Sequence, residues 1–409
     1  YSSIEKTISL EKNVVYNFEM EPVASMMKEV VIEDKRLSEN VTSNEMSLVK
    51  MKMNEIKKIP ALMGEVDLIK AIQMLPGIQS AGEGSSGFSV RGGSTDQNLI
   101  LLDEAPVYNA SHLFGFFSVF NNDAVKDITL YKGDIPVMYG GRISSLLDVR
   151  QKDGNMKKIT GCGGIGSISS RIAIEGPIKR DTSSFIIAAR RSYADLFLPF
   201  AKNKDLRKNK LYFYDANFKV NYIFSQKDRI FLSGYFGRDM FKVNMTDKFS
   251  MSWGNYTVTL RWNHIFNEKL FSNYTLISSN YNYELDANIT GMGFKWLSEL
   301  KDYSLKSDFG YYLNTNNTVK FGIVTTMHKF SPAKIEGYGE NNIFNTIETP
   351  KISALEHSLY LSNEQKLSSR ISFNYGIRYT LFQNIGPATV YKFNDKYVCI
   401  DTVEYNDWN

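Results

Sequence analysis

The sequence has few cysteines and no long apolar run, and each scarcity excludes a class of protein. Cys162 and Cys399 are its only cysteines in 409 residues, too few for a disulfide framework or a zinc cluster. The longest apolar stretch, Leu113–Phe120, is under half of the roughly 20 residues that a membrane helix needs. The net charge of +4 is small, and no basic run is interleaved with aromatic residues. We therefore expect no metal or cofactor, no helical membrane span and no nucleic-acid partner.

Catalytic motifs are missing as well. The four histidines are scattered, and no nucleophile elbow, metal-ligand spacing or phosphate loop is present. The Gly82-Glu-Gly84 pattern lacks the strand-to-helix context of a nucleotide-binding loop. We predict that the chain has no catalytic residue and is not an enzyme.

Aromatic residues are abundant, with 24 Tyr and 26 Phe, although the mean hydropathy is −0.28. From about Gly161 onward, apolar and polar residues alternate with a period of two, most clearly in Arg370–Tyr379, Tyr212–Tyr222 and Val258–Phe266. A soluble β-sandwich can have a similar composition. However, these stretches exceed the usual strand of ~5–6 residues and match the ~9–11 residues of a strand that crosses a bilayer. The sequence predicts a mainly β protein, with a transmembrane antiparallel β-barrel whose outer face meets lipid.

Short polar turns alternate with longer links along residues 156–409, as they do at the two ends of an outer-membrane barrel. The short turns are Pro177–Asp181, Ser225–Asp228, Asn267–Lys269, Asn314–Asn317 and Leu367–Ser369; the long links are Ala201–Lys210, Asp239–Ser250, Asp286–Leu297 and Ser331–Lys351. The alternation predicts about eleven or twelve strands. Because the chain ends at Asn409 without a strand that closes on an aromatic residue, we expect a partial barrel.

Residues 1–155 differ in character from the rest. Residues 1–22 alternate loosely, as at the end of a small β-domain, and residues 23–59 resemble a linker rich in Lys, Glu, Met and Ser. A helix-like pattern after Pro60 ends at Pro76-Gly77. From there to Gly154, short β-type runs lie between glycine-rich turns. We expect residues 60–155 to form a compact α+β domain inside the barrel.

The motifs of this region occur in a characteristic order. They are Leu75–Ile78, Phe88–Gly93, Asn98–Asp103, Ala105–Val107, Val125–Gly133 and Met138–Arg150, with weaker matches at Ile174–Ile178 and Ala189–Tyr193. In this order the sequence resembles the TonB-dependent outer-membrane receptors, in particular those of the Bacteroidetes type. The resemblance implies a plug domain inside a barrel of about 22 strands, located in the outer membrane of a Gram-negative bacterium.

The resemblance also implies partners. Glu29, Val30, Val31 and Ile32 stand where the family carries its energy-coupling box, and such a β-branched run can pair with TonB by strand addition. TonB would act with ExbB and ExbD, and outer-membrane lipid would surround the barrel. Residues 1–22 resemble the end of the carboxypeptidase-regulatory-like domain that often precedes such plugs.

Two groups of residues in the plug are candidates for function. Arg91 and Arg142, beside glycines, are expected to bridge to carboxylates of the barrel and so latch the plug. The outer tip of the plug is expected to form the floor of the cargo site, and its candidate residues are Ser85, Ser86, Tyr108, Asn109 and His112. Asp103 and Glu104 are expected to shape a turn.

The resemblance implies active import of a scarce nutrient such as an iron–siderophore, haem or cobalamin. Lys132–Met138 departs from the pattern of receptors that work with a lipoprotein lid, which favours a receptor that works alone. The alternatives are a SusC-like importer of oligosaccharides or peptides under a surface lipoprotein, and a non-transporting surface receptor or complex component. A passive porin is disfavoured because it needs no folded plug.

Overall fold

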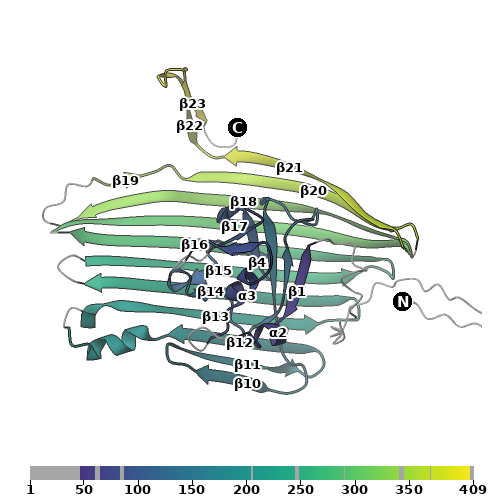
Figure 1. Ribbon diagram of the computed structural model, residues 1–409. Coiled ribbons are helices and arrows are strands. Elements are labelled where there is room, and N and C mark those ends of the chain that lie inside the picture. Colours follow the sequence, from purple (N-terminus) through teal and green to yellow (C-terminus); the bar gives the residue numbers. More distant parts are fainter. Residues whose placement is uncertain are drawn as a thin grey trace, which may run out of the picture.

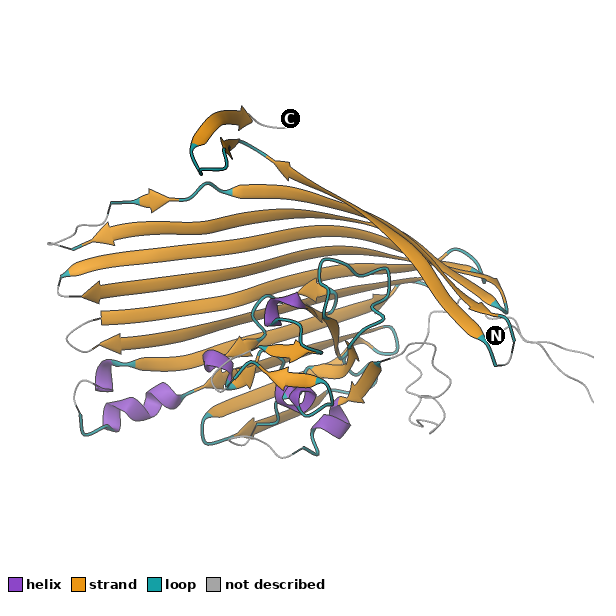
Figure 2. Ribbon diagram, turned by 45° about the horizontal axis from the view of Figure 1, so that its top comes forward, coloured by secondary structure: helices purple, strands orange, loops and turns teal. Residues whose placement is uncertain are grey.

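The computed structural model describes residues 47–59, 65–82, 87–203, 206–244, 248–289, 291–339, 345–368 and 370–405. Two parts make up the fold: one large antiparallel sheet and a smaller domain that lies against one face of it (Figures 1 and 2). We call them the barrel wall and the inner domain. Among the described residues, no helix has both the length and the apolar character that a membrane span requires.

The barrel wall is a 12-stranded sheet in which neighbours in the chain pair antiparallel. Its strands are β10 (Thr160–Ile165), β11 (Ser169–Lys179), β12 (Ser183–Ser192), β13 (Lys210–Ile223), β14 (Asp228–Asn244), β15 (Lys248–Ile265), β16 (Leu270–Ile289), β17 (Met292–Asn314), β18 (Asn317–Tyr338), β20 (Ile352–Lys366) and β21 (Ser372–Ile385), with β19 (Ile347–Glu348) beside β18. Two 3₁₀ segments, η3 (Ala194–Phe200) and η4 (Leu206–Lys208), lie between β12 and β13, and the hairpin of β22 (Ala388–Phe393) and β23 (Cys399–Tyr405) follows β21 (Figure 1). The predicted strand number is confirmed.

The short turns lie at one end of the wall, as predicted, but three of the expected long links consist partly or mostly of strand. In Ser331–Lys351, residues up to Tyr338 continue β18 and Ile347–Glu348 form β19. Residues Asp239–Asn244 continue β14 and Lys248–Ser250 begin β15, while most of Asp286–Leu297 belongs to β16 and β17. Their outward residues are polar, as with Lys242 and Ser250, which pair across β14 and β15. The backbone ladder nevertheless continues beyond the apolar band, because strand pairing depends on backbone hydrogen bonds and not on the polarity of one face.

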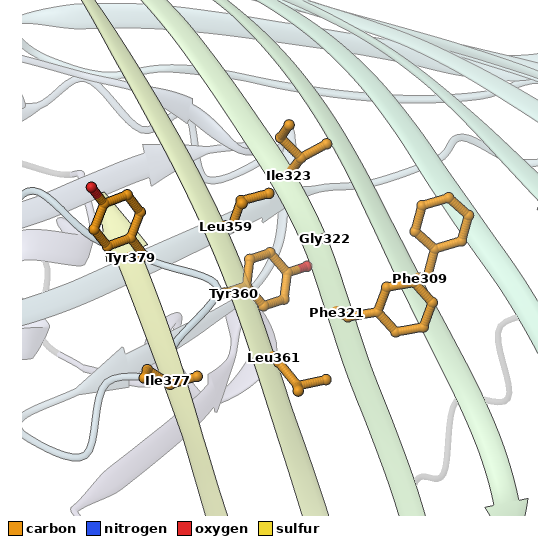
Figure 3. Close-up of a pocket in the computed structure, with 9 residues that line it drawn as sticks. All are labelled: Phe309, Phe321, Gly322, Ile323, Leu359, Tyr360, Leu361, Ile377 and Tyr379. Carbon is orange, nitrogen blue, oxygen red and sulfur yellow. The ribbon is translucent and has the colours of Figure 1, made fainter. Parts of the chain in front are cut away.

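The outer face of the wall is apolar in its middle portion, as a lipid-facing surface must be. Figure 3 shows the groove that β17, β18, β20 and β21 form there. Its floor carries Leu359 and Leu361, which are about half exposed, between larger side chains on both sides. Phe309 and Phe321 stack with their ring centroids 5.1 Å apart on neighbouring strands. Charged side chains are absent from the lining of this groove.

The opposite face of the same strands is polar and is covered by the inner domain. On β13, Asp215, Asn217, Lys219 and Asn221 are at most 4% exposed, whereas Tyr214, Phe218 and Tyr222 are more than one third exposed. The alternation in Tyr212–Tyr222 is therefore confirmed. A row of buried polar groups needs partners, and the inner domain supplies some of them, with His112 beside Asp215 and Asp103 beside Lys219.

A five-stranded sheet in the order β1-β8-β9-β4-β5 forms the centre of the inner domain. Its strands are β1 (Leu48–Lys52), β8 (Val125–Tyr131), β9 (Ser145–Gln151), β4 (Asn98–Leu102) and β5 (Ala105–Pro106). Around it lie α2 (Met53–Ile56), α3 (Leu68–Gln73), η1 (Thr95–Gln97), η2 (Leu113–Gly115) and two small hairpins, β2 (Ile78–Ser80) with β3 (Phe88–Val90) and β6 (Ser111–His112) with β7 (Phe117–Ser118).

The helix predicted before Pro76 is shorter than its pattern suggested. It begins at Leu68 because the Asp67 side chain accepts a hydrogen bond from the Lys70 amide at 2.9 Å, which caps α3. Ile69 and Ile72 of α3 are buried in the core. The inner sheet also begins earlier than residue 60, since β1 pairs with β8 inside the stretch expected to be linker. Its neighbours Met53 and Ile56 are buried, so residues 48–59 belong to the folded domain.

Candidate functional site

In the inner domain, the tight turn between β4 and β5 reaches the barrel wall. Leu102 pairs with Ala105, so Asp103 and Glu104 form a two-residue hairpin loop with φ of 45° and 74°. Such loops favour Asn and Gly because other residues rarely adopt positive φ. The turn expected from the sequence is present, and both of its carboxylates bind cations of the wall.

Glu104 lies at the centre of a cluster of cations. One carboxylate oxygen accepts hydrogen bonds from Arg261 at 3.1 Å and Arg150 at 3.3 Å, and the other accepts from Lys306 Nζ at 2.8 Å. Arg261 and Lys306 belong to the wall, whereas Arg150 belongs to the inner domain. Burial raises the pKa of Glu104, but the three cations outweigh this effect and hold the pKa well below its usual range. The carboxylate is therefore ionised and paired.

Lys219 of the wall binds two carboxylates beside this turn. Its Nζ lies 3.3 Å from Asp103 and 2.9 Å from Asp153, and it also donates to the Gln151 carbonyl at 2.9 Å. Burial raises the pKa of Asp153, but Lys219 and Arg229 lower it by more, so it lies below its usual value. Acidic groups of the inner domain thus meet basic groups of the wall at a second point.

Arg190 makes a third connection, and it is 4% exposed. Its guanidinium donates to Glu65 at 3.0 Å, to the Ser118 carbonyl at 2.7 Å and to Asp215 at 2.6 Å. Glu65 and Ser118 belong to the inner domain, so one side chain of β12 binds two of its segments. At the edge of the domain, Arg171 of the wall likewise donates to a carboxylate of the inner domain, that of Asp123, at 2.8 Å.

At His112 the charges are the other way round: the basic group belongs to the inner domain and the carboxylates belong to the wall. The histidine belongs to the inner domain and is 1% exposed, with Nδ1 2.6 Å from Asp239 and Nε2 3.2 Å from Asp215 of the wall. Its ring stacks on Phe213 with centroids 4.2 Å apart. Burial lowers the pKa of His112, but the two carboxylates outweigh it and raise the pKa above its usual value.

Three residues expected to face cargo contact the wall instead. Tyr108 donates a hydrogen bond to Asp302, the Asn109 carbonyl accepts one from Asn255 at 2.6 Å, and His112 is buried as described. The expectation rested on side-chain chemistry, and polar aromatic groups serve a wet interface as well as a ligand. Ser85, Ser86 and the coupling segment Glu29–Ile32 lie outside the described residues.

Among the described residues, the two arginines expected to latch the plug make their hydrogen bonds within the inner domain. Arg91 has positive φ, is exposed and donates to Ser47, just before β1 of its own domain. Arg142 is exposed and donates to the carbonyl of its neighbour Gly141 at 2.8 Å. In the described interface, most of the buried carboxylates belong to the inner domain and most of the buried cations to the wall. A latch role for Arg91 and Arg142 stays a prediction.

A cleft of about 350 Å³ separates the inner domain from the wall beside β16–β21. It is lined by Tyr108, Tyr139 and Arg142 on one side and by Lys306, His328 and Arg378 on the other. His328 lies 2.7 Å from Asp302, and Arg378 donates to the carbonyls of Val137 and Met138 at 3.2 and 3.1 Å. The cations that the wall contributes to this cleft are therefore already bound to protein groups.

Comparison with known proteins agrees with this architecture. Residues 49–145 match the family described as TonB-dependent Receptor Plug Domain. The fold matches the ferric enterobactin receptor PfeA of Pseudomonas aeruginosa, a G324V mutant, with a TM-score of 0.61 at 13% identity over 84% of this chain and 59% of that one. It also matches the copper transporter OprC, with a TM-score of 0.64 at 11% identity over 88% and 60%. The fold also matches the unliganded ferric citrate transporter FecA, with a TM-score of 0.59 at 10% identity over 88% of this chain and 58% of that one.

A search of curated proteins returned no match. The chain spans about three fifths of the length of the solved structures that it resembles.

A folded α+β domain that sits on the polar face of a lipid-facing antiparallel sheet defines a plugged outer-membrane β-barrel. Residues 49–145 match the plug domain of TonB-dependent receptors, and the rest of the described chain has the fold of part of the barrel in the solved structures that it resembles. From here the inner domain is called the plug. The narrower resemblance to receptors of the Bacteroidetes type stays a prediction.

Sequence reasoning missed the partners of the plug, although part of the signal was present. The alternation predicts a polar face on β13, and Asp215 and Lys219 on that face are partners of the plug, bound to His112 and Asp103. Nothing in the alternation tells which plug residue meets which position, because that depends on how the two folded parts dock. Glu65, Arg190 and Lys306 therefore could not be paired from sequence.

Proposed function

We propose that the full-length protein is a TonB-dependent active transporter that captures a scarce extracellular nutrient and imports it into the periplasm, without chemical change to the cargo. The observation that carries the proposal is the plug itself, which is bound to the wall by many buried ion pairs and hydrogen bonds. Smaller apolar contacts, such as those of Leu113 and Phe117 with Phe213, lie beside them. Polar contacts of this kind can be exchanged for water when the plug moves, whereas a passive porin has no use for them.

TonB would engage the plug from its N-terminal side. Glu29, Val30, Val31 and Ile32 form a β-branched run suited to strand addition, and TonB would be energised by ExbB and ExbD. The first described element after this run is β1, an edge strand of five residues that pairs only with β8. A pull on the run therefore reaches β1 first. Arg91, bound to Ser47 at the start of β1, stands where this force enters the plug.

The cargo is proposed to be an iron–siderophore, haem, cobalamin or a similar scarce nutrient. The fold is shared with receptors for ferric enterobactin and ferric citrate and with a copper transporter, which favours a metal-containing cargo. A SusC-like importer with a lipoprotein lid is the second candidate. It is supported by no contact in the described chain, and Lys132–Met138 departs from the pattern of that class.

Deletion of Glu29–Ile32 in the full-length receptor tests the proposal. We expect uptake of radiolabelled ferric siderophore, haem or cobalamin to be lost in whole cells, while binding of the same compound to the cell surface persists. Deletion of Ser38–Val41, which removes four linker residues and leaves the run in place, serves as the matched control and should retain uptake. Uptake that survives the first deletion would overturn the coupled-transport proposal.

A further inference from the structure

The helical segment between β12 and β13 exposes aromatic side chains at the end of the wall opposite the short turns (Figure 1). This segment, η3, is a 3₁₀ helix over Ala194–Phe200, and side chains three positions apart lie above one another in such a helix. Phe197 and Phe200 therefore share one side of η3, where they are 61% and 86% exposed. Exposed apolar side chains that gather in one place mark a surface that binds a partner or a membrane.

Contacts fix η3 to the outward face of the wall. Arg190 faces inward, where it binds the plug, so the next residue, Arg191, faces outward. The Arg191 guanidinium lies over the Tyr212 ring, 5.2 Å from its centroid, and its Nη2 lies 3.2 Å from the Asp195 carboxylate. Asp195 belongs to the first turn of η3. The segment is therefore attached to the side of the wall that meets lipid, and not to the lumen.

Outward aromatic rings mark the edge of the apolar band on this side of the membrane. Tyr214 and Phe236 lie with their ring centroids 5.8 Å apart, and Phe236 pairs with Tyr256 on the next strand. Rings in this position form the girdle at which outer-membrane barrels meet the membrane surface. Arg191 pairs with Tyr214 in register, so η3 starts just beyond the girdle. Its exposed aromatic side lies where the hydrocarbon layer gives way to lipid headgroups.

Farther from the membrane centre, two lysines of neighbouring strands face each other. Lys210 of β13 pairs with Lys242 of β14, and the adjacent pair is Leu211 with Phe241. Phe241 is inward, because its ring contacts Phe114 of the plug with centroids 5.4 Å apart. Both lysines therefore point outward. Like charges directly opposite each other destabilise a pair of strands, and an anion between the two ammonium groups would remove the repulsion.

The height of the lysine pair identifies the kind of anion. Lys210 lies four residues beyond Tyr214 on β13, which is roughly 13 Å along the strand and about 10 Å along the membrane normal at the usual tilt. The polar layer of a phospholipid leaflet is only about 5–8 Å thick. A lipid phosphate at the height of the lysines must therefore be carried on a larger headgroup, and a phosphorylated sugar headgroup meets this requirement.

We infer that the outward surface formed by Phe197, Phe200, Lys210, Tyr212 and Lys242 binds a phosphorylated glycolipid of the outer leaflet. We call this surface the outer collar. Lys210 and Lys242 bind a phosphate of the headgroup through charge-assisted hydrogen bonds. Phe197 and Phe200 enter the boundary between the sugars and the acyl chains, a position that suits aromatic side chains. The outer collar continues the lipid-facing side of the wall and lies outside the lumen, so the bound lipid is independent of what the receptor transports.

Spin labelling of the full-length receptor in lipopolysaccharide-containing nanodiscs tests the position of η3. The label is placed at Phe200→Cys after every native cysteine, Cys162 and Cys399 included, is replaced by serine. Its collisions with oxygen, which concentrates in hydrocarbon, are compared with those with a water-soluble nickel chelate. We expect an oxygen-to-nickel ratio at least threefold that of a label at Lys227→Cys, which is exposed in a short polar turn. A ratio equal to that control, or protection from both reagents by a protein partner, would overturn the inference.

Gel filtration of the full-length receptor with lipopolysaccharide tests the lysine pair, with the bound lipid counted per receptor. Lys210→Ser combined with Lys242→Ser should lower the bound amount at least fivefold. Arg180→Ser combined with Lys227→Ser removes two exposed cations at the opposite end of the wall and should change it by less than twofold. An unchanged heat-induced mobility shift would show that both double variants are folded. Equal losses from the two, equal binding of phosphatidylglycerol or dephosphorylated lipopolysaccharide, or displacement by inorganic phosphate would overturn the inference.

Discussion

At the scale of single residues, the same side chains shape the plug and attach it to the barrel. Glu104 stands at positive φ in a turn that glycine would form with less strain, yet its carboxylate binds three cations. His112 lies between two carboxylates of the wall with almost no exposure. Glu104 has a backbone conformation that residues other than glycine rarely adopt, and His112 is a polar residue that is fully buried. Both depart from what local sequence would favour, and both make a plug-to-wall contact, as expected where such departures are retained for function.

Replacement of Glu104 separates the two effects. Glu104→Gln keeps the strained backbone and leaves the cations without their carboxylate, and removal of one partner from a buried pair costs about 3–5 kcal/mol. Glu104→Gly removes the same charge but relieves the backbone by about 1 kcal/mol. We expect both variants to release the plug at lower urea concentration than wild type, with Glu104→Gly affected less. Equal midpoints for wild type and Glu104→Gln would contradict the assignment.

His112 predicts a pH dependence. Its pKa in the folded protein is raised above the usual value of 6.5, so its stabilising contribution is fully present below that value. The contribution is lost as the pH rises through the raised folded-state pKa. Its charged and titratable neighbours are Asp215, Asp239, Tyr235 and Arg190.

The pH dependence is measured as the urea midpoint of plug release between pH 5.5 and pH 9. The midpoint of the wild type should fall over this range, and that of His112→Asn should fall less. Glu104 does not interfere, because its pKa lies well below the range. Parallel curves for the two proteins would show that His112 does not titrate in the interface.

At the scale of elements, the barrel and plug could be predicted from sequence in outline, and their contacts could not. The period-two alternation from Gly161 onward predicts the strands because every second residue faces lipid. It fails at Asp239–Ser250 and Asp286–Leu297, where the polarity of the faces exchanges while the ladder continues. Arg91 and Arg142 were assigned to the latch from charge alone. In the described part of the chain, carboxylates of the plug make the buried ion pairs with cations of the wall. Which groups pair depends on docking and not on local pattern.

Aromatic residues lie directly opposite glycines at several places in the barrel wall. The pairs are Phe218 with Gly234, Phe271 with Gly310, Tyr338 with Gly293 and Tyr360 with Gly322. In each pair, a Cβ on the glycine would come within 2.7 Å of the opposing ring or its hydroxyl. The aromatic ring covers a glycine that has no side chain to pack, which stabilises the strand pair.

Gly310→Val tests this pairing. The added Cβ would lie 2.3 Å from the Phe271 ring, so the ring must move, and we expect a loss of about 1–3 kcal/mol in barrel stability. Phe271→Ala combined with Gly310→Val should recover part of the loss, because the clash is removed. Heat-induced unfolding, followed as the mobility shift of the folded barrel on a gel, measures both. A double variant as unstable as the sum of the single variants would argue against a direct contact.

At the scale of the whole molecule, the plug is a domain bound to the barrel by opposite charges. The proposed coupling segment, Glu29–Ile32, precedes its edge strand β1 in the chain. The acidic plug groups Glu65, Asp103, Glu104 and Asp153 meet Arg190, Lys219, Lys306 and Arg229 of the wall. This arrangement predicts that a pull at the N-terminal side moves the plug and leaves the barrel folded.

Single-molecule pulling tests that prediction most directly, with the periplasmic domain of TonB on the probe and the full-length receptor in a supported bilayer. We predict that the chain extends by plug residues alone, beginning with β1, and that Glu104→Gln lowers the force at which the plug leaves the wall. Deletion of Glu29–Ile32 should abolish the attachment. Barrel strands that unravel together with the plug, or an attachment that survives the deletion, would contradict the account.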